Sequence, residues 1–245
     1  MRVEMLIPPS LTVEPEAIDL QVVYEDEVVC VIDKPAGLVV HPAPGHAGGT
    51  VVNALVHRFP ALDESGSVRP GLVHRLDKDT SGLMVVGLTP VAQASLASQV
   101  KTHSMSRGYV ALVQGHVMPN RAMIDIPVGR DPISRKRMAA GPKAIRARPA
   151  VTHYEVNELV GSLSLVLVRL ETGRTHQIRV HMAYIGHPVA GDTLYKGPVL
   201  PGLHRQFLHA SSLEFAHPVT GDKVQFKCEM PSDLRVVLER LRQLR

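Results

Sequence analysis

The pattern of apolar and polar residues predicts a chain with more strands than helices. Apolar runs of strand length, several with alternating polar positions, occur at 22–24, 28–32, 83–88, 109–113, Val151–Val160, Leu163–Leu170, 206–215 and 223–228. The acidic turn at 25–27 predicts a hairpin between the first two. Leu163–Leu170 alternates strictly enough to have one buried face.

Helical spacing of apolar residues and capping residues predict four helices. They are expected at 50–55, 90–101, 178–186 and from residue 232 to the C-terminus, with Thr50 capping the first and Ser232 or Asp233 the last. The segment 119–149 has little periodicity, and we predict that it is irregular. Strands mostly joined by hairpins indicate an α+β fold, a mixed, largely antiparallel sheet with flanking helices.

Composition adds a weak indication of the partner. The chain has 245 residues and a formal net charge of +4, which suits a polyanion such as RNA but is also compatible with solubility alone. Its two cysteines, Cys30 and Cys228, form no CxxC pair. No apolar run reaches membrane-spanning length, so we expect a cytoplasmic protein.

The most informative stretch is the polar cluster in GLVHRLDKDTSGLMVVGLT, at residues 71–89. Seven polar residues interrupt an apolar strand-turn-strand pattern, namely His74, Arg75, Asp77, Lys78, Asp79, Thr80 and Ser81. Burying such a group without partners is costly, so these side chains are expected to be solvated, paired or catalytic.

This cluster contains HRLDKDTSGL, which closely resembles the signature of the RluA-type pseudouridine synthases. The resemblance covers nearly the whole chain, in the expected order: KPAGLVVHP at 34–42, SRGYVALVQG at 106–115, LETGRTHQIRVHMAYIGHPVAGD at 170–192 and QFLHA at 206–210. It implies an enzyme that isomerises uridine in structured RNA with an aspartate and without a cofactor.

By this resemblance the catalytic residue is Asp77. The reaction breaks the N1–C1′ glycosidic bond of uridine, turns the base and joins C5 to C1′. A carboxylate beneath the sugar could attack C1′ or remove the C2′ proton. The sequence does not separate these two routes.

The resemblance also places three side chains around Asp77. Arg179 matches the arginine that pairs with the catalytic aspartate, and such a partner favours the ionised carboxylate and fixes its rotamer. Tyr109 matches the active-site tyrosine that stacks on the base and is proposed to remove the C5 proton. Leu208 matches an apolar position against the base. From spacing alone, Tyr109 and Leu208 could equally be core residues.

Arg75 is the candidate wedge that enters the RNA when the target uridine is flipped out. Without the resemblance, an ion pair between Arg75 and Asp79 would be the preferred interpretation. Asp77 and Asp79 could also form the acid and base of a glycosidase. The motif favours the synthase and gives Asp79 a role in organising the loop.

Further substrate contacts are expected from His74, Arg174 and Lys34, in an active-site cleft across the sheet. Arg174 could instead hold its own loop. The one dense basic segment is read either as a solvated surface or as a phosphate-contacting flap, with Arg130, Arg135, Lys136, Arg137 and Lys143 as its candidate contacts.

We predict no metal site, because His176 and His181 have poor spacing for chelation and no cysteine or acidic residue completes a set. These histidines are expected to support or cap neighbouring residues. No nucleotide or flavin motif occurs either.

The D type of large-subunit ribosomal pseudouridine synthases is the nearest resemblance, and its members usually carry an S4-like domain before the catalytic domain. We therefore expect 1–14 to be a linker or remnant of such a domain and 15–245 to be the catalytic domain. Large-subunit rRNA is the expected substrate, with tRNA as the alternative. An RNA glycosidase and a non-catalytic RNA-binding module are the competing classes, and a monomer is expected.

Overall fold

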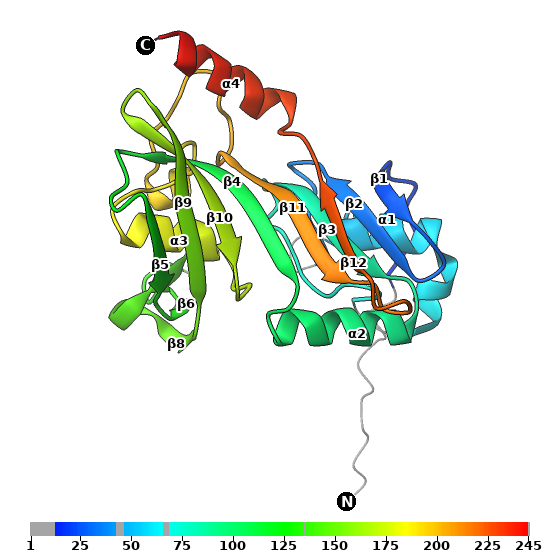
Figure 1. Cartoon of the computed structure of the whole chain (residues 1–245). Helices are drawn as coiled ribbons and strands as arrows, with labels where there is room; N and C mark the ends of the chain where they lie inside the picture. Colours follow the sequence, from blue (N-terminus) through cyan, green and yellow to red (C-terminus); the bar gives the residue numbers. More distant parts are fainter. Residues whose placement is uncertain (1–12, 43–46, 66–68, 135, 245) are drawn as a thin grey trace, which may run out of the picture.

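A nine-stranded sheet forms the centre of the molecule, as seen in the computed structural model, which describes residues 13–42, 47–65, 69–134 and 136–244. The strand order is β1-β2-β3-β11-β4-β10-β9-β5, and β12 pairs with β11 (Figure 1). Every pairing is antiparallel except that of β3 with β11. The strands are β1 (Gln21–Glu25), β2 (Val29–Lys34), β3 (Ser81–Gly87), β4 (Ser106–Gln114), β5 (Arg121–Asp125), β9 (Val151–Val160), β10 (Leu163–Leu170), β11 (Leu208–Ala216) and β12 (Lys223–Lys227).

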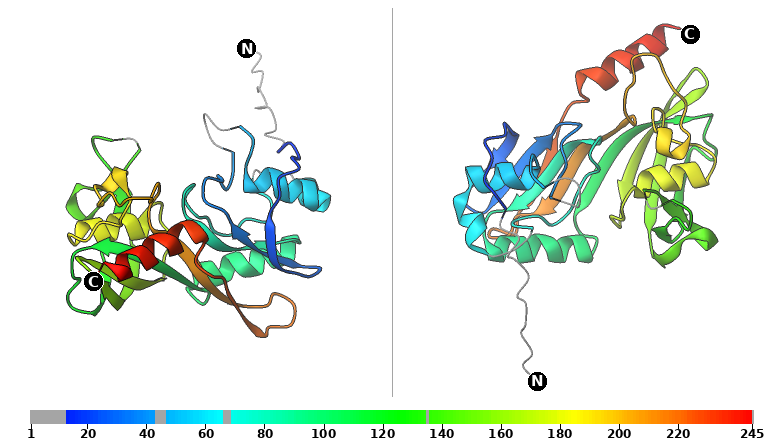
Figure 2. Two further views of the ribbon diagram at one scale, coloured as in Figure 1. Left: turned by 90° about the horizontal axis from the view of Figure 1, so that it is seen from above. Right: turned by 180° about the vertical axis from the view of Figure 1, so that it is seen from behind.

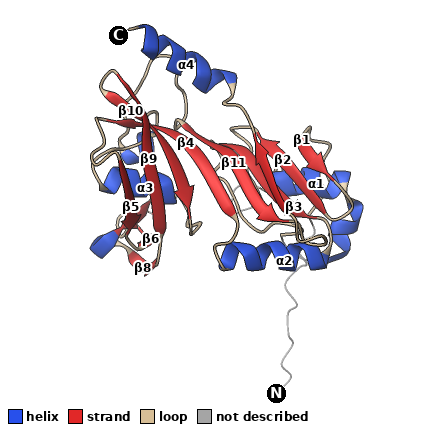
Figure 3. Ribbon diagram, viewed as in Figure 1, coloured by secondary structure: helices blue, strands red, loops and turns tan. Residues whose placement is uncertain are grey.

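Helices cover both faces of this sheet. They are α1 (Val51–Arg58), α2 (Pro90–Lys101), α3 (Gln177–Tyr184) and α4 (Ser232–Gln243). Apolar residues of α1, α3 and α4 belong to the main core, whereas α2 packs into a second core on the other face. Figure 2 shows α1 and α3 on the same side of the sheet (Figure 2, right; coloured by class in Figure 3). The α+β fold class and its mixed, largely antiparallel sheet are confirmed.

The apolar strands beside β3 are buried on both faces. In β2, Cys30 and Ile32 face the main core, while Val29 and Val31 face the core under α2. The strand β3 is buried at every position. Parallel pairing with β11 depends on Gly82, because a Cβ at this position would collide with the carbonyl of Ala210.

Of the two predicted helix caps, that of α1 is confirmed. Thr50 accepts a hydrogen bond from the Asn53 amide at the start of α1, and Pro90 follows the N-cap of α2. The prediction that Ser232 or Asp233 caps α4 is wrong. Pro231 is the N-cap and its extended backbone begins the helix, while the Asp233 carboxylate binds Arg205 instead, at 2.6 Å.

The prediction of an irregular segment over 119–149 is also wrong. It holds β5 and a separate three-stranded sheet in the order β7-β6-β8. These strands are β6 (Val128–Arg130), β7 (Met138–Ala140) and β8 (Ile145–Arg148). These three strands have only three or four residues, and β8 is exposed along its whole length. Such short or fully exposed strands leave no alternating pattern in the sequence.

Of the expected N-terminal linker, residues 1–12 lie outside the described residues. The next two pack on α1, since Val13 is buried and Asn53 donates to the Glu14 carbonyl. Within the described part of the chain, no helix is long and apolar enough to cross a membrane.

Candidate active site

A buried lysine, Lys34, stabilises the loop that carries Asp77. The ammonium group of Lys34 donates to the carbonyls of Pro35, Leu38 and Lys78 at 2.8, 2.9 and 3.0 Å. Its side chain is wholly buried, and burial lowers its pKa to about 8. All three N–H groups are therefore occupied by the loops, and the expected substrate contact of Lys34 is replaced by a structural role.

Asp77 forms an ion pair with Arg179, as the resemblance implies, and the carboxylate of Asp192 binds the same guanidinium through its other nitrogens. Arg179 donates to Asp77 at 3.0 Å and binds Asp192 in a fork, with distances of 2.6 and 2.9 Å. Burial opposes the charged guanidinium, but the two carboxylates outweigh it and raise the pKa of Arg179. The pair geometry fixes the orientation of Asp77.

A tyrosine and a histidine complete the surroundings of this ion pair. The guanidinium of Arg179 lies 5.2 Å from the ring centre of Tyr195, whose hydroxyl hydrogen-bonds with His176 Nδ1 at 3.0 Å. The other ring nitrogen of His176 is 4.0 Å from Asp77. Burial lowers the pKa of His176, so the imidazole is neutral at neutral pH. His176 is the N-cap of α3 but makes no side-chain cap bond.

Tyr109 and Leu208 come from the neighbouring strands β4 and β11 and reach the same cleft as Asp77. Both are nearly buried, with exposed fractions of 6% and 4%, and Leu208 pairs with Ala111 in the sheet. Burial raises the pKa of the Tyr109 phenol, and the charge of Arg107 acts against this rise. The structure therefore brings together Asp77, Arg179, Tyr109 and Leu208 from four separate segments.

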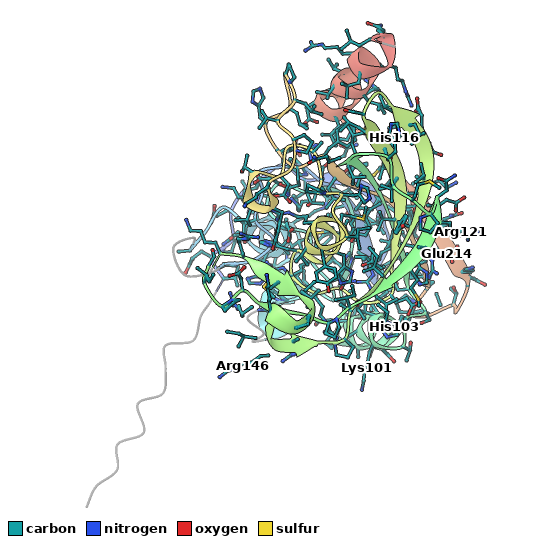
Figure 4. All side chains as sticks on the ribbon, turned by 90° about the vertical axis from the view of Figure 1, so that its left-hand side faces the viewer. Lys101, His103, His116, Arg121, Arg146 and Glu214 are labelled. Carbon is teal, nitrogen blue, oxygen red and sulfur yellow. The ribbon has the colours of Figure 1, made fainter. Side chains whose placement is uncertain are left out.

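The cleft has a volume of about 580 Å³ and a basic lining. Among the described residues that line it, Asp77 is the only acidic one, whereas the lysine and arginine residues are Arg69, Arg75, Lys101, Arg107, Arg174 and Arg179. Lys101 is the last residue of α2, and His103 lies two positions beyond it (Figure 4). This distribution of charge suits a polyanion that presents one neutral group to Asp77.

Arg75 lies at the boundary of two hollows. It lines the main cleft and an adjacent hollow of about 450 Å³, which also shares Asp77, His176 and Arg179. Its side chain is exposed, and no ion pair joins it to Asp79 among the described residues. Asp79 lines only the second hollow, where its backbone carbonyl accepts from Arg205.

His74 and Arg174 also line the main cleft, but both have structural partners. The Val85 amide donates to His74 Nε2 at 3.1 Å, and burial lowers the pKa of this imidazole to about 3, so it is neutral. Arg174 donates through Nε to the Pro149 carbonyl at 3.0 Å, which holds its own loop. Substrate contacts from these two residues remain predictions.

The residues of the basic segment differ in their surroundings. Arg130, Lys136 and Lys143 are exposed, whereas Arg137 packs 5.4 Å from the ring centre of Tyr195 and lies 3.9 Å from Asp131. Arg137 is thus part of the support of the site rather than a free surface cation. Arg135 lies outside the described residues.

The comparisons with known proteins agree with this geometry. Residues 28–184 match the family model of RNA pseudouridylate synthases. The chain is 51% identical to an uncharacterized RNA pseudouridine synthase of Chloroflexus aurantiacus, over 85% of this chain and 65% of that protein. It is 45% identical to the ribosomal large subunit pseudouridine synthase D of Zymomonas mobilis, over 98% of this chain and 78% of that protein.

The fold points in the same direction. The solved structure of human RNA pseudouridylate synthase domain containing 4 superposes with a TM-score of 0.71 at 26% identity, covering 91% of this chain and 93% of that one. The protein is thus an enzyme of the RNA-modifying, isomerising class. It belongs to the RNA pseudouridine synthase family, which confirms the resemblance seen in its motifs.

Two functional positions were not identified from the sequence. Asp192 and Arg107 both lie within motifs that match the family, but neither was given a role. The available signal was that each is a charged residue in an otherwise apolar neighbourhood. Both are almost completely buried, and only the structure identifies their contacts.

Proposed function

We propose that this protein converts specific uridines of large-subunit rRNA to pseudouridine, with Asp77 acting on the ribose of a flipped nucleotide. The observation that carries the proposal is the Asp77–Arg179 pair at 3.0 Å, at the base of a basic cleft that also contains Tyr109 and Leu208. A cytoplasmic location follows from this substrate.

The reaction is an internal transfer in which no atom is lost. The N1–C1′ bond breaks and its electron pair stays on the uracil; after the base turns, C5 bonds to C1′, loses its proton, and N1 gains one. Asp77 serves either as the nucleophile at C1′ or as the base at C2′. Its fixed position beside Arg179 suits both routes.

In this proposal Tyr109 and Leu208 hold the base while it turns, which is supported by their presence with Asp77 in the lining of the cleft. A stacked ring lets the uracil rotate in its own plane without losing contact. In this proposal Tyr109 takes the C5 proton. Burial raises the pKa of this phenol, and the charge of Arg107 opposes that rise.

Arg75 is the proposed wedge. Its guanidinium is exposed at the boundary of the two hollows, directly beside the loop of Asp77. A planar cation at this point can stack on the bases left behind and contact phosphate.

The choice of large-subunit rRNA rests on the relatives, since the protein of Zymomonas mobilis is named for that substrate. The test is incubation of unmodified large-subunit rRNA with wild type, Asp77→Asn and the matched control Asp79→Asn, followed by carbodiimide labelling and primer extension. New stops with wild type and Asp79→Asn, and none with Asp77→Asn, are the expected result.

Other outcomes would assign a different function. Stops in tRNA alone would replace the rRNA substrate by tRNA. Release of free uracil would indicate a glycosidase, and binding without any product would indicate an RNA-binding module.

A further inference from the structure

Arg107 is a buried cation whose hydrogen-bonding capacity is mostly unused. It lies on β4, is 4% exposed and lines the cleft beside Tyr109. Of its five N–H groups, one donates to the Glu171 carbonyl at 2.9 Å, while the Nε atom is buried without a partner. Among the described residues no carboxylate pairs with it, in contrast to Arg179 and Arg205, which both have acidic partners.

A buried guanidinium without a counter-charge is unfavourable for the free protein. Burial lowers the pKa of Arg107, which means that the site disfavours the charge it contains. A neutral side chain at this position would avoid that cost. An unsatisfied buried donor at the wall of a functional cleft is therefore best explained by a ligand group that satisfies it.

The surrounding backbone leaves room for this guanidinium. A Cβ on Gly173 would lie 2.7 Å from Nη1 of Arg107, so the loop before α3 carries a residue without a side chain where it passes the arginine. The backbone angles of Gly173 are not those that require glycine. Close approach to Arg107 is thus the reason that the structure offers for glycine here.

The position of Arg107 relative to Tyr109 indicates which ligand group it meets. The two residues are separated by one position on β4 and face the same side, about 7 Å apart along the strand. Arg179, not Arg107, holds Asp77. If the sugar of the flipped nucleotide lies at Asp77 and its base at Tyr109, as proposed above, Arg107 is left facing the edge of the base.

We propose that Arg107 donates hydrogen bonds to a carbonyl oxygen of the flipped uracil and stabilises the negative charge that the base carries once the N1–C1′ bond has broken. Arg107 keeps its own protons throughout, so no proton transfer is involved. Uracil offers carbonyl oxygens at C2 and C4, and arginine can only donate. Cytosine has an amino group at C4, so a contact at O4 would also select uridine.

The inference rests on the proposed function and is tested by pairing a protein change with a substrate change. Single-turnover rates are measured for wild type, Arg107→Gln and Arg107→Lys on RNA with uridine, 2-thiouridine or 4-thiouridine at the target position. Sulfur is a weak acceptor, so it removes most of the hydrogen bond that we propose. The matched control is Arg169→Gln, which removes an exposed arginine from β10 of the same sheet.

We expect Arg107→Gln to lower the rate about 100-fold with RNA affinity nearly unchanged, Arg107→Lys to be intermediate, and Arg169→Gln to match wild type. One of the two thio substrates should lower the single-turnover rate of the wild type. The same substrate should not lower the rate of Arg107→Gln any further, because the hydrogen bond has already been lost. Arg107→Lys, which keeps the charge, provides the same comparison if Arg107→Gln does not fold in a melting experiment.

If Arg107→Gln and the thio substitution lower the rate independently, so that their effects multiply for both thio substrates, the proposal is overturned. Arg107 would then be a structural residue. Loss of RNA affinity alone, at an unchanged rate of the bound complex, would also overturn it and indicate a phosphate contact. Wild type that forms no pseudouridine in the uridine RNA would instead refute the proposed function. These failures are therefore distinguishable.

Discussion

At the scale of single residues, the site depends on a chain of charges rather than on one pair. Arg179 lies between Asp77, which is partly open to the cleft, and Asp192, which is buried and also accepts from the Tyr195 amide. Because Asp192 uses both oxygens on Arg179, it sets the direction in which the third guanidinium nitrogen points. Asp192 is thus a positioning residue for Asp77.

Replacement of Asp192 by Asn should lower both stability and turnover. One partner of a buried ion pair is lost, which costs about 3 kcal/mol, and Arg179 is no longer fixed against Asp77. Urea unfolding and single-turnover rates measure the two effects, with the exposed Asp222→Asn as the control. Wild-type values of both quantities in Asp192→Asn would contradict this account.

At the scale of elements, the junction of β3 and β11 supports the loop of Asp77. These strands pair in parallel over two residues, and Ser81 Oγ, at the start of β3, hydrogen-bonds with His209 Nδ1 at 3.0 Å. The other ring nitrogen of His209 lies 3.3 Å from Cys228 Sγ. Only three residues separate Ser81 at this junction from Asp77, so a disturbance here is expected to reach the catalytic loop.

Substitution of Gly82 by Ala should be strongly destabilising. Its φ of +115° disfavours any side chain, and the new methyl group would collide with the Ala210 carbonyl of β11. We expect a loss of more than about 2 kcal/mol in denaturant unfolding. Gly161→Ala, which has φ of +58° but open space around it, should cost only about 1 kcal/mol; equal losses would show that the collision with β11 is unimportant.

The same junction should make stability depend on pH. Burial, followed by the charge of Arg205, lowers the pKa of His209 to about 4, from 6.5 in the unfolded chain. Between these values the unfolded chain binds more protons, so the stabilisation is complete above pH 6.5 and is lost as the pH falls toward 4. The contribution of His209 amounts to about 3 kcal/mol.

His209→Gln should therefore show a shallower loss of unfolding free energy than wild type between pH 6.5 and 4. The exposed His116→Gln is the control and should retain the wild-type slope. If His209→Gln has the same slope as wild type, the histidine is not neutral in the folded protein.

At the scale of the whole molecule, the cleft lies between two parts of the chain that share the long sheet. One part carries the Asp77 loop and α2, and the other carries α3. The small sheet of β6, β7 and β8 adjoins this cleft through α3 and Tyr195, and the exposed residues Lys136 and Lys143 lie in the connections between its strands. Arg146 extends from the same sheet at the edge of the molecule (Figure 4). We therefore predict that the small sheet contacts RNA that extends beyond the cleft.

The double substitution Lys136→Glu and Lys143→Glu should weaken RNA binding and flatten its dependence on salt. Each phosphate contact that is lost lowers the slope of log affinity against log salt by about 0.7. Binding titrations at several salt concentrations measure this slope. Reversal of Lys223 and Lys227 on β12 is the control, and an equal effect in both variants would indicate only a change of net charge.

Much of this architecture could be predicted from the sequence, but unevenly. The long strands β9 and β10 and the helix α2 were predicted at their observed bounds because periodicity and capping are local properties. The Asp77–Arg179 pair was predicted from motifs. The strands β6, β7 and β8 were missed, since pairing among such short segments depends on tertiary contacts.

The roles of Lys34 and Arg107 could not be predicted for a related reason. From the sequence, a lysine in a motif is interpreted as a substrate ligand. The structural role of Lys34 follows only from its three carbonyl partners, and two of these, Leu38 and Lys78, are not adjacent to it in the sequence. For Arg107 the informative feature is the lack of a counter-charge among the described residues. Only the three-dimensional arrangement reveals either property.

The central claim, that Asp77 performs the isomerisation, is tested most directly by tritium release from RNA labelled at C5 of uridine. The reaction must release this hydrogen, so wild type and Asp79→Asn should release tritium at similar rates. Asp77→Asn should bind the RNA with similar affinity and release none. Release by Asp77→Asn at the wild-type rate would contradict the account and require another catalytic group in the cleft.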